Sequence, residues 1–274
     1  DNERKGKIGL PSKKGSLINE SIKLLLDLWT QSRRSEKSLI RQLGCTAAQL
    51  FESLENIAYE IQNKGGQSDE EDDAPIIDLQ IILIELYRLG RHVNPHEVLA
   101  YMSQTAGILI SPGPETYRFA HRMFQEYMAA SYLARQNKPE MVRSLIETQY
   151  TSWREACLLV GDVLSETNRG EQLWTLLDAL CDIQLSELSN PECPHWHSVW
   201  LAARILIEQQ LTPNPESTIQ ETVCNRLRAI LVLLLETPGA LPPKNRFDCG
   251  KALAILGDNR PGIGINKRTG IPDI

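Results

Sequence analysis

The stretch that decides the fold is residues 117–130, "YRFAHRMFQEYMAA". A short polar turn, "SPGPE", precedes it, and an amphipathic helical pattern continues beyond it. In that turn Pro112 pre-sets one central position, and Gly113 can supply the positive φ of the next. The pattern predicts a β-hairpin over Ile108–Phe119 and a helix over His121–Gln136. One histidine therefore stands where a strand ends and a helix begins, with a Gln-Glu pair just inside the helix.

Two helices are predicted before this hairpin. The first spans residues 76–90, "IIDLQIILIELYRLG", and the second spans residues 94–107, "NPHEVLAYMSQTAG". The second begins with Asn94 as its cap and Pro95 at its first helical position. Two helices followed by a hairpin are the ingredients of a winged helix. The predicted fold class is mainly α, with a winged-helix domain carrying one short β-hairpin, followed by a helical, loosely solenoid-like domain.

Two more helices are predicted upstream. Residues 15–33 carry Ser16 as a plausible N-cap, with Leu17 and Leu24 among the residues of an apolar stripe. Residues 46–63 form a second helical pattern, with a stripe of four apolar residues, Leu50, Leu54, Ala58 and Ile61. The following run, 64–75, contains Gly-Gly and five consecutive acids, so we expect a solvated loop.

After Lys138 the chain reads as a series of amphipathic helices with short breaks. Each has a wide apolar stripe that needs a neighbour, which suggests stacked helical pairs. The Gly- and Pro-rich end reads as a linker to a further domain. The predicted domains are 1–14 as the end of an upstream domain or linker, 15–136 as the winged helix with its acidic loop 64–75, 137–242 as the helical domain, and 243–274 as the last helix and linker to a missing C-terminal domain.

The composition indicates a soluble globular protein. The 274 residues are 42% hydrophobic and 23% charged, with a formal net charge of −6 and a pI of about 5.5. This charge disfavours nucleic-acid and anionic-membrane partners, and no apolar run approaches the roughly 20 residues of a membrane span. Six cysteines lack paired spacing, which favours a reducing compartment. We expect a cytoplasmic piece of a longer protein, because the start has neither an initiator Met nor a signal-peptide core.

The search for catalytic motifs is negative. The sequence has no phosphate-binding loop, no dinucleotide fingerprint, no H-E-x-x-H and no G-x-S-x-G. We therefore expect no catalysis, and no bound cofactor, from this chain alone. Cys193, His195 and His197 have metal-capable side chains at alternating positions, but a structural metal needs a fourth ligand that is not nearby. No metal site is predicted there.

His121 is the candidate functional residue. The first turn of a helix has unpaired N–H groups and the positive end of the macrodipole, which favour anions such as phosphate. An imidazole at this position can donate a hydrogen bond to an approaching negative group. The residue pattern taken alone favours the alternative, a histidine that only caps the helix or packs on the hairpin.

The other residues of the stretch are predicted to be structural. Phe119, Phe124 and Tyr127 read as core residues, and Gln125 and Glu126 could cap the first helical turn or bind a neighbouring helix.

These residues carry a family resemblance. "YRFAHRMFQEYMAASYLA" resembles the stretch F-x-H-x-x-F-Q-E-[YF]-x-A-A that closes the winged helix of NACHT-family signal-transduction ATPases. "GLPSKKGSLINESIKLLLDLW" is similar to the opening of that domain in bacterial members, and "SWREACLLVGDVL" to the helix after it. The end, "RFDCGKALAILGDNRPGIGINKRTGIPDI", resembles a run that often precedes a formylglycine-generating-enzyme-like domain, although Cys249, Gly250 and Asn259 depart from it.

The resemblance implies a regulatory segment of a nucleotide-switched protein. In the family, bound ADP holds the nucleotide domain against the winged helix, and the motif histidine contacts the β-phosphate; ATP, with Mg²⁺, breaks that contact and permits oligomerisation. Carried across, His121 is the sensor. The implied partners are an upstream nucleotide-binding domain, a downstream formylglycine-generating-enzyme-like domain and further copies of the protein, with prokaryotic defence as the setting.

Two rival functions remain. The chain could be a non-catalytic helical scaffold, or its winged helix could bind DNA. A DNA-reading helix needs clustered Lys and Arg to neutralise phosphates. The candidate recognition helix, residues 94–107, has neither, and the wing has only Arg118. This disfavours DNA binding.

Overall fold

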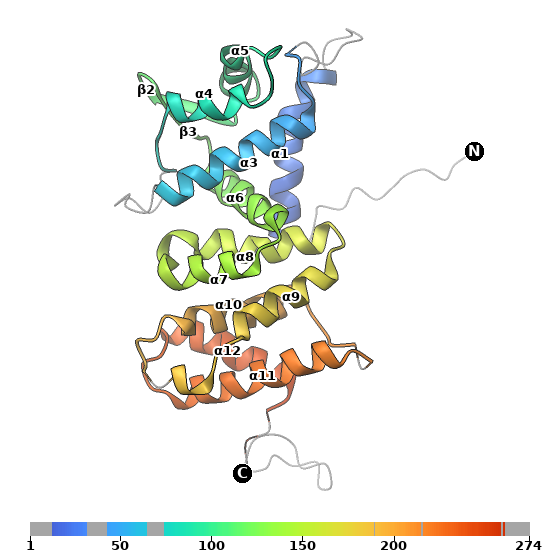
Figure 1. Ribbon diagram of the computed structural model, residues 1–274, viewed down its shortest axis with the longest axis vertical. Helices are drawn as coiled ribbons and strands as arrows, with labels where there is room; N and C mark the ends of the chain where they lie inside the picture. The colour runs from blue at the N-terminus through green and yellow to red at the C-terminus, as the bar shows by residue number, and fades with distance from the viewer. Residues whose placement is uncertain are drawn as a thin grey trace, which may run out of the picture. The chain divides into compact units, whose positions relative to one another are not determined.

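The computed structural model describes residues 13–31, 43–64, 74–188, 190–214, 216–258 and 260. The chain divides into two compact units, Asp1–Gln136 and Asn137–Ile274, and helices dominate both (Figure 1). The prediction of a mainly α protein, with a small sheet in its winged helix, is confirmed. Residues 65–73 of the predicted acidic loop, the linker 261–274 and the first 12 residues lie outside the described residues.

Unit 1 opens with α1 (Lys14–Gln31), which differs from the prediction in its start and its buried face. The helix begins before Ser16, so that serine is not its N-cap. Where burial is described, over residues 14–26, the buried hydrophobic side chains are Ile18, Ile22 and Leu26, spaced four apart, whereas Leu17 and Leu24 are 46% and 51% exposed. Both sets fit a helical period, and packing against the rest of unit 1, including α6, selects the face of Ile18, Ile22 and Leu26.

The next helix, α3 (Ala47–Lys64), is held at its start by a capping box. Thr46 Oγ1 accepts the backbone N–H of Gln49 at 3.2 Å, and Gln49 Oε1 accepts the backbone N–H of Thr46 at 2.9 Å. The predicted apolar stripe is buried as expected, at Leu50, Leu54, Ala58 and Ile61.

A three-stranded antiparallel sheet of order β1-β3-β2 follows, with helices between its first and second strands. Only two strands were predicted. The third strand forms from residues at the start of the helix predicted to begin at residue 76, because Ile77 pairs with Tyr117 of β3. The elements in chain order are β1 (Ile77–Asp78), α4 (Leu79–Tyr87), α5 (Pro95–Ala100), η1 (Tyr101–Thr105), β2 (Leu109–Gly113) and β3 (Thr116–Phe119).

The hairpin turn lies two residues later than predicted. Gly113 is the last residue of β2, and the positive φ of 54° falls on Glu115 instead. Pro114 precedes Glu115. The turn therefore still has a proline followed by a residue with positive φ, as predicted, but the two residues are Pro114 and Glu115 rather than Pro112 and Gly113. The backbone carbonyl of Glu115 accepts the N–H of Leu79 at 2.8 Å, which ties the turn to the start of α4.

The helix predicted over residues 94–107 is interrupted by a π-helical turn. Asn94 caps α5 as predicted, its side chain accepting the N–H of His96 at 3.1 Å. From Tyr101 the helix widens, and the N–H of Ala106 donates to the carbonyl of Tyr101 at 2.8 Å. The Tyr101 hydroxyl donates to the carbonyl of Leu26 at 2.7 Å, which attaches this turn to α1.

Unit 1 closes with α6 (Arg122–Gln136), which packs along α3. A buried carboxylate on α3 joins the two helices. Glu55 accepts hydrogen bonds from Ser131 at 2.5 Å and from the guanidinium of Arg135 at 2.6 Å. Burial raises the pKa of Glu55, and these hydrogen bonds oppose the rise. The contact fixes how α6 lies on α3.

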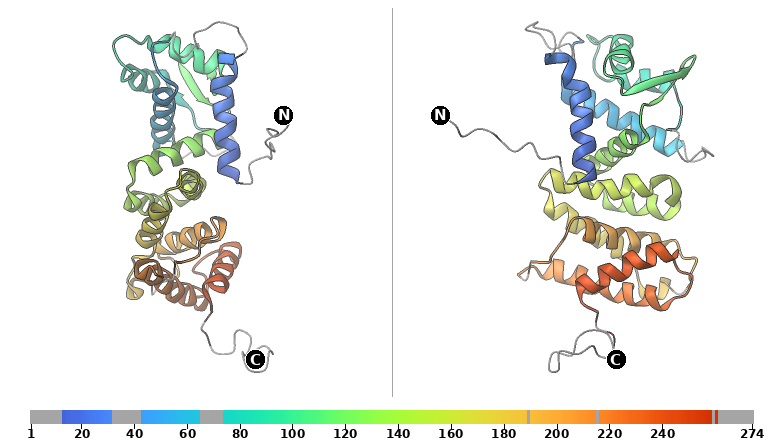
Figure 2. Two further views of the ribbon diagram at one scale, coloured as in Figure 1. Left: turned by 90° about the vertical axis from the view of Figure 1, so that its right-hand side faces the viewer. Right: turned by 180° about the vertical axis from the view of Figure 1, so that it is seen from behind.

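Unit 2 is a stack of helices (Figure 2). They are α7 (Pro139–Thr148), α8 (Tyr150–Glu166), α9 (Gly170–Cys181), the 3₁₀ turn η2 (Leu185–Leu188), α10 (His195–Glu208), α11 (Thr218–Glu236) and α12 (Pro243–Leu256). The predicted series of helices after Lys138 is present; α9 ends at Cys181, and the 3₁₀ turn η2 follows it.

Arginines from neighbouring helices cap three helix ends in unit 2. Arg143 of α7 donates to the carbonyl of Asp182 after α9 at 2.7 Å. Arg246 of α12 donates to the carbonyls of Leu234, Leu235 and Thr237 at the end of α11, and Arg228 of α11 donates to Leu256 at the end of α12. A cation at a helix C-terminus pairs with carbonyls that have no partner within the helix.

All six cysteines are free. Burial raises the pKa of Cys181 and of Cys249 to about 12, so these thiols remain protonated and behave as small apolar side chains. Within the described residues, no helix is long and apolar enough to cross a membrane.

Candidate functional site

His121 lies immediately before α6, at the N-cap position. Its carbonyl accepts the N–H groups of Phe124 at 3.0 Å and of Gln125 at 3.4 Å, which starts the helix. The imidazole ring is exposed and meets the ring of Phe124 edge to face, with centroids 5.2 Å apart. The position thus combines a solvent-accessible imidazole with the N-terminal end of a 15-residue helix.

The apolar residues of the motif around His121 are buried. Phe119, the last residue of β3, is buried, and so are Phe124 and Tyr127 on the first turns of α6. Ala129 and Ala130 are buried too, where small side chains let α6 lie close to its neighbours. The aromatic residues are core residues, as their pattern predicted.

Gln125 turns to the neighbouring helix, one of the two roles predicted for it. Its Nε2 donates to Gln62 Oε1 on α3 at 2.7 Å, and both side chains are buried. Gln125 Oε1 is buried and has no hydrogen-bond partner within the described residues. A buried amide pair of this kind sets the rotation of α6 about its axis, because rotation would leave more polar groups unsatisfied.

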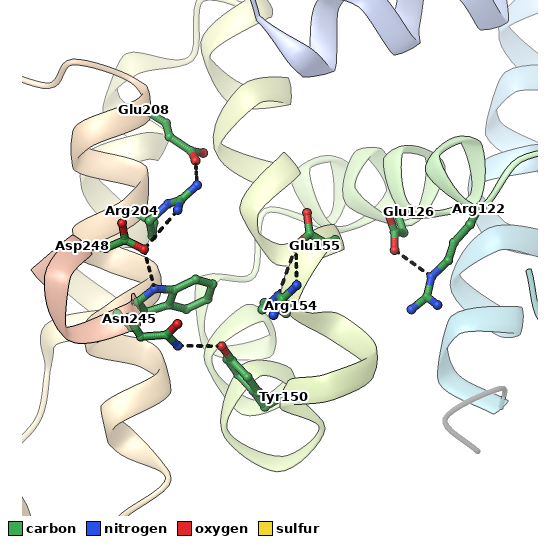
Figure 3. A network of polar contacts seen from close by, with 10 residues as sticks. Arg122, Glu126, Tyr150, Arg154, Glu155, Arg204, Glu208, Asn245 and Asp248 are labelled. Atoms are coloured by element: carbon green, nitrogen blue, oxygen red, sulfur yellow. Dashed lines mark hydrogen bonds and ion pairs between the residues drawn. The ribbon is translucent and has the colours of Figure 1, made fainter. Parts of the chain in front are cut away.

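Glu126 pairs with its own helix. Arg122 Nε lies 3.0 Å from Glu126 Oε1, an i,i+4 pair in which the carboxylate is buried and the arginine is partly exposed (Figure 3). The two charges of this pair offset each other within the first two turns of α6.

Gln62 and Glu55 are the residues that the sequence interpretation missed. Both are polar residues of α3, and both are buried. Gln62 lies four residues after Ala58, so it falls on the same apolar stripe. A polar residue at such a position signals a buried hydrogen bond, but the sequence does not say which helix supplies the partner.

The Cys193, His195 and His197 group does not converge on one point. His195 Nδ1 lies 2.9 Å from Glu147 Oε1, His197 stacks on Tyr150 with centroids 4.0 Å apart, and Cys193 Sγ contacts the carbonyl of Glu187. Across the described ranges, no group of three or more His, Cys, Asp or Glu side chains is arranged to hold a metal ion.

Glu147 organises this part of unit 2. Ser198 Oγ donates to its carboxylate at 2.5 Å and Arg143 Nε at 2.9 Å. Burial acts to raise the pKa of Glu147, but the hydrogen bonds from Ser198, His195 and Arg143 together lower it below its ordinary value. Burial lowers the pKa of His197, and the nearby Glu147 partly offsets this.

A second polar network joins α8, α10 and α12 within unit 2 (Figure 3). Arg204 Nη1 lies 3.1 Å from Asp248 Oδ2 and also pairs with Glu208, while Asn245 donates to the Tyr150 hydroxyl at 2.8 Å. Every group in this network has a protein partner, so we assign it to the packing of the helices.

The order of elements and the sheet order define unit 1 as a winged helix. Residues 14–133 match the family described as the winged helix-turn-helix domain C-terminal to NACHT. The match supports a NACHT context for this chain and a regulatory role associated with NACHT proteins. No curated protein and no solved structure matches the chain.

Proposed function

We propose that this chain is the regulatory and transmission segment of a NACHT-type nucleotide-switched signalling ATPase, with His121 as the phosphate sensor. The single observation that carries the proposal is the contrast within the motif. Phe119, Phe124, Gln125 and Tyr127 are buried, while the imidazole of His121 is exposed at the start of α6. Packing accounts for the buried residues; an exposed imidazole at a helix N-terminus is available to an anion.

The chain's residues fit one contact to a phosphate and no complete nucleotide site. The sequence has no phosphate-binding loop, and the described residues offer no cluster for Mg²⁺. The domain expected upstream would therefore hold ADP or ATP with Mg²⁺, and the number of phosphates would supply the charge difference that is sensed. His121 would donate an N–H to a phosphate oxygen in the ADP state.

The contacts behind His121 would pass its position to the rest of unit 1. The Gln62–Gln125 pair and the Glu55 contacts attach α6 to α3, so a shift at the start of α6 is carried along the helix as a rigid element. Loss of the histidine contact in the ATP state would release the winged helix and permit oligomerisation. The downstream partner would be a formylglycine-generating-enzyme-like domain, and the chain itself would perform no catalysis.

A non-catalytic scaffold is the rival function, and DNA binding by the wing is less favoured. The helix in the recognition position, α5 with η1, contains no Lys or Arg, and among the wing residues only Arg118 is basic. Without cations, neither element can neutralise the phosphates of a DNA backbone.

His121→Ala in the full-length protein tests the sensor role. We expect the variant to lose bound ADP faster, by about tenfold or more, because a charge-assisted hydrogen bond is worth about 1.5–3 kcal/mol. Basal signalling and assembly should rise accordingly. The measurements are the ADP content of the purified protein, the ADP dissociation rate and the oligomeric state with each nucleotide.

His96→Ala is the matched control for this experiment. His96 is also exposed and also lies at the N-terminal end of a helix, α5, but outside the motif. It should retain wild-type ADP affinity. Unchanged ADP affinity and unchanged assembly in His121→Ala would count against the sensor role and favour the scaffold.

A further inference from the structure

The surface of α4 is unusually apolar for an exposed helix. Seven of its nine residues, "LQIILIELY", are apolar, although one face is open to solvent. Ile84 is 58% exposed and Tyr87 62% exposed, and Gln80 and Arg88 share the same face. A helix that is apolar nearly all round is normally covered on every side. We call the four residues Gln80, Ile84, Tyr87 and Arg88 the α4 face.

A groove of about 270 Å³ runs beside the α4 face. One wall comes from Ile81 and Ile84 of α4, and the other from Tyr59 of α3 and Tyr132 of α6. The two tyrosine rings stack with centroids 4.2 Å apart. Helices α3 and α4 lie next to each other in unit 1 (Figure 1). The same surface therefore presents protruding apolar side chains and an aromatic-lined hollow.

The charges at the groove are balanced. Glu60 and Lys64 approach to 3.7 Å on α3, and Glu85 and Arg88 to 2.6 Å on α4. Each wall thus carries one acid and one base, although the whole chain has a net charge of −6. The net charge of −6 opposes association of two copies, whereas these two ion pairs leave the groove without a net charge of its own to repel a second copy.

The helix positions fit a two-fold contact. In an antiparallel pair of α4 helices centred on Ile84, position 87 of one copy lies opposite position 81 of the other, and position 88 opposite position 80. Tyr87 then faces Ile81, which lines the groove, and Arg88 faces Gln80. Such an isologous contact uses one patch twice and matches a protrusion with a hollow on each side.

We propose that the α4 face and the adjacent groove form a two-fold interface between two copies of this chain. The ring of Tyr87 from each copy enters the groove of the other, and the two Ile84 side chains meet at the axis. The contact is small by the standards of permanent dimers, so association is reversible and depends on concentration. The proposal is independent of nucleotide sensing by His121.

Sedimentation velocity of the nucleotide-free 274-residue chain over a wide concentration series measures the association directly. Wild type should shift from monomer towards dimer as concentration rises. Ile84→Glu places two like charges at the axis and should raise the dissociation constant about tenfold or more, a change of about 1.4 kcal/mol. Because Ile84 is exposed, circular dichroism should show an unchanged fold.

The matched control is Ile255→Glu on α12, whose side chain is similarly exposed, at 55%. This variant should dimerise like wild type. A wild type that remains monomeric throughout would overturn the proposal, and so would a dimer that survives Ile84→Glu or is lost in Ile255→Glu.

A cysteine at the axis gives a second readout that separates a two-fold contact from other associations. In a symmetric dimer, position 84 meets itself, so Ile84→Cys should form an intermolecular disulfide rapidly under mild oxidation. Ile255→Cys should not. Equal cross-linking of the two variants would contradict the symmetric interface even if wild type dimerises.

Discussion

Individual polar residues fix the orientation of α6 in unit 1. Gln125 and Gln62 meet in the interior of unit 1, where Gln125 Nε2 donates to Gln62 Oε1 at 2.7 Å and Gln125 Oε1 lacks a partner within the described residues. A buried pair of amides with one unsatisfied oxygen contributes no more stability than a pair of apolar side chains of the same shape. Its value lies in fixing the rotation of α6, and with it the position of His121.

Gln125→Leu should destabilise the chain by about 1–3 kcal/mol, because Gln62 Oε1 loses the Gln125 donor inside an apolar environment. The double variant Gln62→Leu/Gln125→Leu should recover most of that loss, since both partners are then apolar. Urea unfolding followed by circular dichroism measures both values. A double variant whose loss equals the sum of the single losses would show that the two amides are not coupled.

At the scale of the element, two helices of unit 2 end at a residue in the left-handed backbone conformation, which strains a non-glycine residue. In α10 the N–H of Leu211 donates to the carbonyl of Leu206 at 3.0 Å and that of Gln210 to Ile207 at 3.1 Å, which is a Schellman motif. Gln210 therefore has a φ of 51°, a conformation that favours glycine. The same motif ends α8, where Asn168 takes a φ of 54°.

Gln210→Gly should stabilise unit 2 by about 0.5–1 kcal/mol, because relief of the left-handed strain exceeds the added freedom of the unfolded chain. The side chain of Gln210 is exposed, so little packing is lost. Asn168→Gly is the comparison, and its gain should be smaller since asparagine tolerates this conformation. Thermal unfolding of both variants measures the difference; a destabilised Gln210→Gly would contradict the argument.

At the scale of the whole molecule, the two units carry buried or partly buried ionisable groups whose pKa shifts have opposite effects on how stability changes with pH. In unit 1 the pKa of Glu55 is raised by burial, so its contribution to stability is present at low pH and is lost as pH rises through its folded value. In unit 2 the pKa values of His197 and Glu147 are both lowered. Each of these two groups binds its proton more readily in the unfolded chain, so stability falls as the pH is lowered.

Unit 2 should therefore lose stability first below a pH of about 6.5, the ordinary pKa of histidine, and again below about 4.3, that of glutamate. Four of the five tryptophans, Trp153, Trp174, Trp196 and Trp200, belong to unit 2, so tryptophan fluorescence mainly follows this unit. Urea unfolding between pH 8 and pH 5 gives the slope of the free energy of unfolding against pH. His197→Gln should flatten it, and an unchanged slope would exclude His197 as its source.

Much of this protein follows from local sequence. Local residue patterns predict the helices, the hairpin before His121, the capping by Asn94 and the apolar stripe of α3. Each of these features depends on spacing and capping residues only a few positions apart. The place of His121 just before α6 follows from the same rules, whereas its exposure is known only from the structure. The motif around it predicted the winged helix that the family match supports.

The tertiary structure decided what depends on residues distant in sequence. Strand β1 exists only because Ile77 finds Tyr117, and the buried face of α1 is chosen by α6 rather than by its own period. The partners of Gln125 and Glu55 lie 63 and 76 or more residues away. Helical periodicity states which residues can share a face, but the free energy that selects the buried face comes from the surfaces that meet it.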